Sequence, residues 1–85
     1  MAKFLLIPDG DIYAMENATN LFFKLSNNNV DITIDTNIFI EFNERIKYYN
    51  FNDYYTIIVD ENSYYYLNES NRKVITIDEI MNLTL

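Results

Sequence analysis

The 85 residues predict one domain, 1–85, and six Lys and Arg against thirteen Asp and Glu give a net charge of −7, which argues against a basic nucleic-acid-binding face. The sequence contains no Cys and no His, which excludes disulfides, zinc sites of the Cys/His kind, and Ser-His or Cys-His nucleophile pairs. No apolar run approaches the ~18 residues of a membrane span, so we expect a cytoplasmic protein that does not bind membranes. Because of its net negative charge, we also expect it not to bind nucleic acid.

The first predicted element is a strand over 4–7, because four consecutive apolar residues are typical of a strand buried on both faces. Pro8 ends this strand. Asp9, Gly10 and Asp11 are then predicted to turn the chain and to cap a helix. Ligation of a divalent cation is the alternative for these carboxylates, but the further oxygen ligands that such a loop needs are missing. We therefore expect no metal and no cofactor.

A helix over 12–26 is the clearest element, because almost every residue falls on an apolar or a polar side at 100° per residue. We expect the apolar side to lie across one face of a sheet. It comprises Leu21, Ala14, Leu25, Ala18, Phe22, Met15, Thr19, Ile12 and Phe23. Either Asn27 or Asn28 is predicted to adopt the left-handed conformation that closes the helix.

Two alternating segments follow, over 30–34 and 38–42, and residues 35–37 between them are typical of a hairpin turn. One continuous bent strand is the alternative. On a continuous strand, Asp31 and Asp35 lie about 13 Å apart, which is close to the ~13.6 Å of four phosphate steps along DNA. A hairpin turn at Asp35 would remove this resemblance to DNA.

The second half of the chain is predicted to hold more strands. Segment 43–52 is compatible with a short helix, and a strand over 54–59, a turn over 60–63 and a strand over 64–67 form a second hairpin. A loop over 68–72, a strand over 73–77 and a helical turn capped by Asp78 follow. The predicted fold class is α+β, with one amphipathic helix on a mostly antiparallel five- or six-stranded sheet and a short C-terminal helical turn.

One helix covers only one face of such a sheet, so the other face needs a partner, the short segments, or exposure to solvent. Seven of the eight tyrosines lie between positions 48 and 66, and both sides of the second hairpin are apolar. Tyrosine is enriched both in strands, for packing, and at protein interfaces. Tyrosines flanked by carboxylates suit a basic partner surface. The predicted partner-binding residues are Asp53, Tyr54, Asp60, Glu61, Tyr65 and Glu69, with Asp31, Glu41 and Glu44 as further contributors. If the tyrosines are core instead, the interface lies elsewhere.

The composition also bears on origin. Residues with AT-rich codons, such as Asn, Ile, Tyr and Phe, are plentiful, yet Lys occurs only four times. This pattern indicates selection against positive charge, although solubility of a small cytosolic domain is an alternative explanation. In size, charge and composition the chain resembles small acidic proteins that phages encode against host defences, namely anti-CRISPR proteins, anti-restriction proteins and DNA mimics.

Without His, a phosphate-binding Gly loop or a carboxylate pair picked out by spacing, we expect the protein not to be an enzyme. The resemblance implies an inhibitor that blocks the basic nucleic-acid-binding surface of a host defence enzyme, with carboxylates in place of phosphates. Two alternatives remain at this stage. One is an antitoxin or immunity protein that neutralises a basic toxin. The other is a small structural or assembly subunit whose sheet face pairs with itself, so both a monomer and a homodimer are open.

Overall fold

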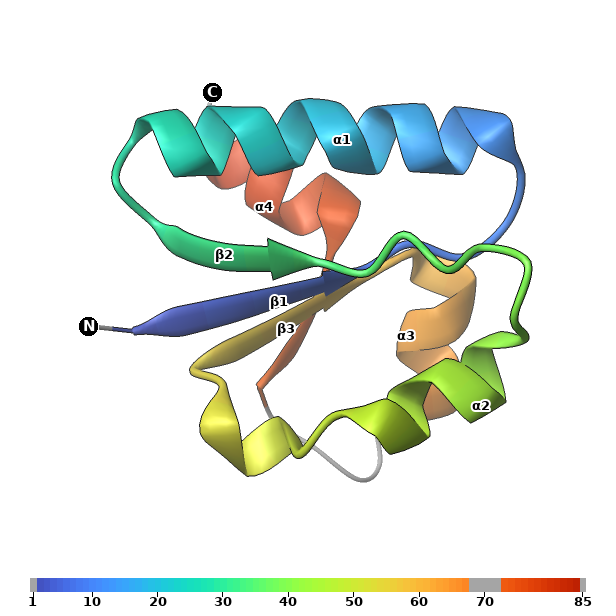
Figure 1. Ribbon diagram of the computed structural model, residues 1–85. Coiled ribbons are helices and arrows are strands. Elements are labelled where there is room, and N and C mark those ends of the chain that lie inside the picture. The colour runs from blue at the N-terminus through green and yellow to red at the C-terminus, as the bar shows by residue number, and fades with distance from the viewer. Residues whose placement is uncertain (1, 68–72, 85) are drawn as a thin grey trace.

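A four-stranded, all-parallel sheet lies at the centre of the computed structural model, which describes residues 2–67 and 73–84 (Figure 1). The strand order is β2-β1-β3-β4. The strands are β1 (Lys3–Ile7), β2 (Asp31–Ile34), β3 (Thr56–Val59) and β4 (Val74–Thr76). The central strands β1 and β3 carry apolar runs that are fully buried, as parallel strands covered on both faces require. The strand predicted over 4–7 is confirmed.

The predicted antiparallel sheet of five or six strands is wrong, because neither hairpin forms. After β2 the chain makes local hydrogen bonds, from Ile38 N to the Thr36 carbonyl (2.9 Å) and from Ile40 N to the Asn37 carbonyl (3.0 Å). These donors are used within the loop, and the chain then enters α2 (Phe42–Arg45). The segment 38–42 therefore joins no sheet. Its alternating apolar residues belong to a turn and the start of a helix.

The second predicted hairpin is replaced by the helix α3 (Glu61–Leu67). Its backbone begins with a hydrogen bond from Tyr64 N to the Asp60 carbonyl (2.9 Å). Ser63 and Leu67, four residues apart, are both buried, while Tyr65 faces solvent. This is helical spacing, and burial at that spacing outweighs the preference of tyrosine for strands.

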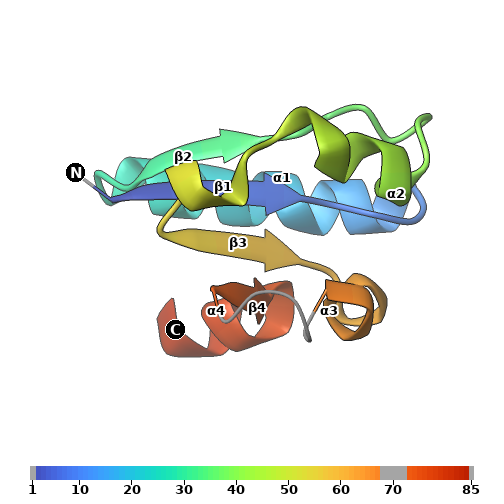
Figure 2. The ribbon, with the colours of Figure 1, turned by 90° about the horizontal axis from the view of Figure 1, so that it is seen from below.

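Helices cover both faces of the sheet, so the molecule has three layers (Figures 1 and 2). On one face, α1 (Ile12–Asn27) and α4 (Ile77–Thr84) pack on alternate strand residues such as Leu6 and Ile58. On the other, Leu5, Ile57 and Val59 pack against α2, the 3-10 helices η1 (Ile46–Tyr48) and η2 (Phe51–Asp53), and α3. The second face is thus covered by short segments of the chain itself, including the short helix considered for 43–52.

The helix predicted over 12–26 is confirmed as α1, and so is its cap. The Asp11 carboxylate accepts hydrogen bonds from the backbone N–H groups of Tyr13 and Ala14, both at 3.1 Å. Two members of the predicted packing side, Ile12 and Phe23, are instead 72% and 57% exposed. The stripe that contacts the sheet is narrower than the apolar side of the helix.

Two local predictions also need correction. The left-handed residue after α1 is Asn29 (φ 64°) and not one of the two preceding asparagines. The cap of α4 is Thr76, whose hydroxyl accepts a hydrogen bond from Glu79 N (3.1 Å), because β4 runs directly into α4 one residue before Asp78. The predicted loop over 68–72 lies outside the described residues. None of the helices in the described ranges combines the length and apolar character needed to cross a membrane.

Candidate functional site

Three aspartates meet at one edge of the sheet, because the carboxyl ends of parallel strands point the same way. Asp9 follows β1 after one intervening residue, whereas Asp35 and Asp60 directly follow β2 and β3. The strand order reverses between β1 and β3, since β2 and β3 lie on opposite sides of β1. In open sheets with helices on both faces, ligands bind outside the carboxyl ends of the strands at this reversal. The carboxyl edge is therefore the first place to seek a site.

A buried arginine from α2 links two of these aspartates. The Arg45 side chain is 0% exposed, with Nη2 3.5 Å from Asp9 Oδ1 and Nη1 3.6 Å from Asp35 Oδ1. Both distances exceed the usual length of a charged hydrogen bond. Within the described part of the chain, no guanidinium nitrogen of Arg45 has a hydrogen-bond acceptor. Arg45 thus neutralises the carboxylates through charge, with the Phe42 ring 5.8 Å from its Cζ.

The same carboxylates accept hydrogen bonds from neighbouring elements. Asp35 accepts from the Tyr49 hydroxyl (2.6 Å) and from Asn37 N (2.8 Å). Asp9 accepts from the Ser63 hydroxyl (3.1 Å), and Asp60 accepts from the Asp9 backbone N–H. We call the three aspartates, Arg45, Tyr49 and Ser63 the inner cluster. Its bonds join the ends of three strands to the loop after β2, to the segment after η1 and to α3.

Two side chains of the inner cluster have shifted pKa values. Burial raises the pKa of Tyr49 to about 12, helped by the hydrogen bond and the charge of Asp35. Burial also raises the pKa of Asp60 above its ordinary value, and the charges of Asp9 and Asp78 act in the same direction. The Asp9 N–H bond and Arg45 oppose this rise. Within the described ranges, no three His, Cys, Asp or Glu side chains converge as metal ligands.

Two open clefts with acidic linings lie beside the inner cluster, and the larger one is lined in part by Asp9 and Asp60 of that cluster. One has a volume of about 400 Å³ and the other of about 260 Å³. Both are lined by Glu61 and Asp78, so they form one surface, which we call the acidic face. Its carboxylates are Asp9, Asp11, Asp60, Glu61, Asp78 and Glu79. None of the described residues that line the two clefts is Lys or Arg.

Three of the predicted partner-binding residues meet on the acidic face. Asp60 and Glu61 line the larger cleft, and Tyr65 lines the smaller one with its side chain 70% exposed. Tyr54 is instead half-buried in the core, with its ring 6.3 Å from that of Tyr49. The prediction that the tyrosines cluster on an uncovered hairpin is therefore wrong, although Tyr65 is presented to solvent.

The other predicted residues are spread over the molecule. Asp31 opens β2 opposite Lys3 of β1, and Asp53 ends η2, so both lie at the amino edge of the sheet. Glu41 and Glu44 are exposed at α2, where Glu44 pairs with Lys47 (3.2 Å). Glu69 lies outside the described residues. Asp35 is buried, so Asp31 and Asp35 do not present a pair of charges with phosphate spacing.

Sequence reasoning missed Arg45 and the acidic residues Asp11, Asp78 and Glu79 as parts of a site. A usable signal was present, because Asp9 and Asp60 follow apolar runs, after one residue and at once, and Asp35 directly follows the alternating segment 30–34. Aspartates in that position are typical of the carboxyl edge of a parallel sheet.

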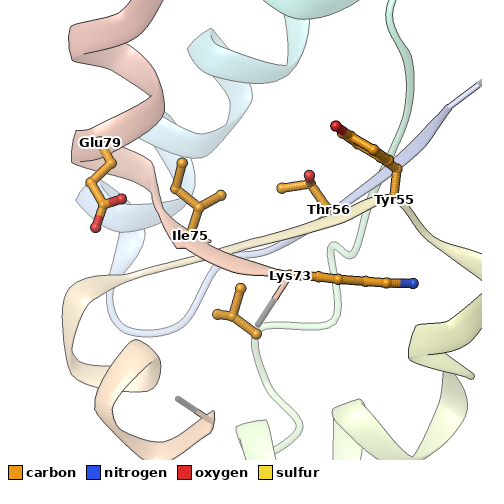
Figure 3. A pocket seen from close by; sticks show the side chains of 6 residues that line it. Tyr55, Thr56, Lys73, Ile75 and Glu79 are labelled. Atoms are coloured by element: carbon orange, nitrogen blue, oxygen red, sulfur yellow. The ribbon is translucent and has the colours of Figure 1, made fainter. Parts of the chain in front are cut away.

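A separate groove of about 520 Å³ lies at the amino end of β3 and β4 (Figure 3). Its polar side chains do not converge, because Lys73 points away from Glu79 and donates a hydrogen bond to the Tyr54 carbonyl (2.7 Å). This groove is a weaker candidate than the acidic face.

Comparisons of the chain with protein-family models, with curated proteins and with solved structures find no match. The geometry of the molecule itself therefore carries the functional argument.

Proposed function

We propose that the protein is an acidic binding protein that inhibits a nucleic-acid-binding enzyme by occupying its basic surface. The observation that carries this proposal is the acidic face, where the carboxylates of α3, α4 and the β1–α1 turn gather and where no Lys or Arg is among the described lining residues. Such a surface favours a partner of opposite charge, and a net charge of −7 accelerates the encounter at low salt.

The acidic face combines charge with an aromatic side chain. Tyr65 stands exposed beside Glu61 and Glu79, which also line the smaller cleft. Tyrosine supplies apolar contact area and a hydroxyl at low entropic cost, while carboxylates occupy the positions that phosphates take on a basic surface. A defence enzyme of the kind that anti-CRISPR and anti-restriction proteins block has such a surface, and phage origin is part of the proposal.

The experiment compares two double variants with equal net charge. Glu61→Lys with Asp78→Lys reverses charge on the acidic face, and Asp31→Lys with Asp53→Lys reverses charge at the amino edge. Each pair replaces two negative charges with two positive ones. The wild type and both double variants are each tagged and used to capture a partner from the cells that produce the protein. Mass spectrometry identifies the partner.

We expect the wild type and the amino-edge variant to retain a basic nucleic-acid-binding protein, and the acidic-face variant to lose it. Added wild-type protein should also displace nucleic acid from the purified partner. Equal retention by both variants, or a partner that still binds nucleic acid when saturated, would contradict the proposal. Capture of a toxin would favour an antitoxin instead.

A further inference from the structure

The loop over 35–41 presents an aromatic side chain to solvent. Phe39 is 98% exposed, the highest value among the large hydrophobic residues of the described chain. Its neighbours are less exposed, since Ile38 is half-buried and Ile40 is 36% exposed. A phenylalanine in this position contributes none of the hydrophobic stabilisation that its burial would give. A polar residue at this position would leave the monomer equally stable.

This loop is held in place from both ends. At its start, Asp35 is 2% exposed and binds Tyr49, Asn37 and Arg45 in the inner cluster. At its tip, the hydrogen bond from Ile40 N to the Asn37 carbonyl closes a turn in which Phe39 is one of the two central residues. At its end, the Glu41 carbonyl accepts from the first turn of α2. Because the backbone of this turn is already held in place, binding of Phe39 costs only the ordering of its side chain, which favours affinity.

The loop also lies on the same edge of the sheet as the acidic face. It leaves the carboxyl end of β2, while the β1–α1 turn and the start of α3 leave the carboxyl ends of β1 and β3 (Figures 1 and 2). Arg45 connects the two regions, since it contacts both Asp35 at the base of the loop and Asp9 in the larger cleft. One partner can therefore contact both.

We propose that Phe39 is the aromatic anchor of the partner interface and enters an apolar pocket whose rim carries Lys or Arg. The basic rim follows from charge complementarity, because exposed Glu41 ends the loop and the acidic face adjoins its base. A second copy of the chain is disfavoured as the occupant, since each copy carries −7. This inference rests on the proposed function. It adds to the interface an apolar contact, which carboxylates cannot supply.

The test measures binding of the captured partner to wild type, to Phe39→Ala and to the matched control Phe23→Ala on α1. We expect Phe39→Ala to raise the Kd about 10- to 100-fold, mainly through faster dissociation, as for an aromatic hot spot. Phe23→Ala should leave the Kd within about twofold. Circular dichroism should show both variants folded.

A photo-crosslink identifies the contact directly. With Phe39 replaced by p-benzoylphenylalanine, irradiation in cells should link this position to a partner peptide that contains apolar residues next to Lys or Arg. If Phe39→Ala keeps the wild-type Kd while the acidic-face variant loses the partner, the anchor is overturned and the proposed function stands. If the crosslink joins two copies of this chain, self-association replaces the anchor. If no basic protein is captured or linked, both proposals fall.

Discussion

The inner cluster and the outer carboxylates of the acidic face contain the same kind of side chain in opposite surroundings. Asp35 is buried, and Asp35 and Asp9 both contact Arg45 and accept hydrogen bonds from neighbouring elements. Glu61 and Asp78 are exposed in the first turns of α3 and α4. Asp9 and Asp35 are thus engaged within the fold, although Asp9 also borders the larger cleft, whereas Glu61 and Asp78 are exposed to solvent.

This difference separates stability from binding. Carboxylates that are paired inside the molecule affect the free energy of unfolding when their partners are removed. Exposed carboxylates act mainly on association with a charged partner, and salt screens them over ~10 Å at 0.1 M. The two groups should therefore respond to mutation in different measurements.

The largest expected effect comes from removing the charge at the centre of the inner cluster. Arg45→Met leaves Asp35 buried without its cation, and we expect a loss of about 3–5 kcal/mol in the free energy of unfolding. Urea denaturation followed by circular dichroism measures this loss. A small domain has a total stability of only about 5–15 kcal/mol, so partial unfolding of this variant is within the expectation.

The double variant Arg45→Met with Asp35→Asn supplies the control. Since it removes the unpaired charge together with the guanidinium, it should recover part of the lost stability. If the double variant is no more stable than Arg45→Met, loss of packing and not loss of charge explains the effect.

A smaller effect is expected at Tyr49. Tyr49→Phe removes the hydroxyl that donates to Asp35, at an expected cost of about 1–3 kcal/mol near neutral pH. The folded state raises the pKa of Tyr49 from its ordinary value of 10.0 to about 12. The wild type should therefore lose stability between pH 10 and 12, as the unfolded chain releases this proton first. Tyr49→Phe should lack this part of the pH dependence, and a matching decline in the variant would rule out Tyr49 as its source.

The same contrast explains what the sequence predicted and what it did not. The strand at 4–7 and the helix after Asp11 depend on local patterns, and both are confirmed. Whether the strands run parallel or antiparallel depends on long-range pairing, such as that of Phe4 with Thr56, which no local pattern specifies. The alternation in β2 suggested a hairpin. In the structure, β2 alternates because Ile32 and Ile34 pack against the core on one face of the sheet, while Asp31 and Thr33 on the other face are exposed.

The residues of the candidate site divide in the same way. Asp60, Glu61 and Tyr65 were predicted from the density of tyrosine and carboxylate, and the structure brings them together. Arg45 was not predicted, because an isolated arginine in sequence gives no sign that it will be buried between aspartates from two strand ends. Glu79 reaches the acidic face only because β4 passes directly into α4.

Asp60 lies between the two groups, because it accepts the Asp9 N–H bond and also lines the larger cleft. Its raised pKa means that the ionised carboxylate lowers the stability of the fold at neutral pH. Asp60→Asn keeps an oxygen acceptor without the charge, so this variant should be more stable than wild type at pH 7. The difference should shrink as the pH falls towards 3.8, because wild type takes up its proton more readily when folded. Urea titrations at several pH values measure this, and a difference that grows on acidification would contradict it.

The smallest effects on stability are expected for the outer carboxylates. Glu61→Gln and Asp78→Asn should each change the free energy of unfolding by no more than about 0.5 kcal/mol, since both residues are exposed. Each substitution removes a negative charge that favours the first turn of its helix, which lowers stability. Each also relieves repulsion on the acidic face, which raises stability, so the two effects oppose each other. Asp78→Asn should still lower the pKa of Asp60, because the charge of Asp78 contributes to its rise. A carboxyl titration by NMR detects that shift without a partner. If either variant loses several kcal/mol, that residue belongs with the inner cluster, and the separation between stability and binding at this edge fails.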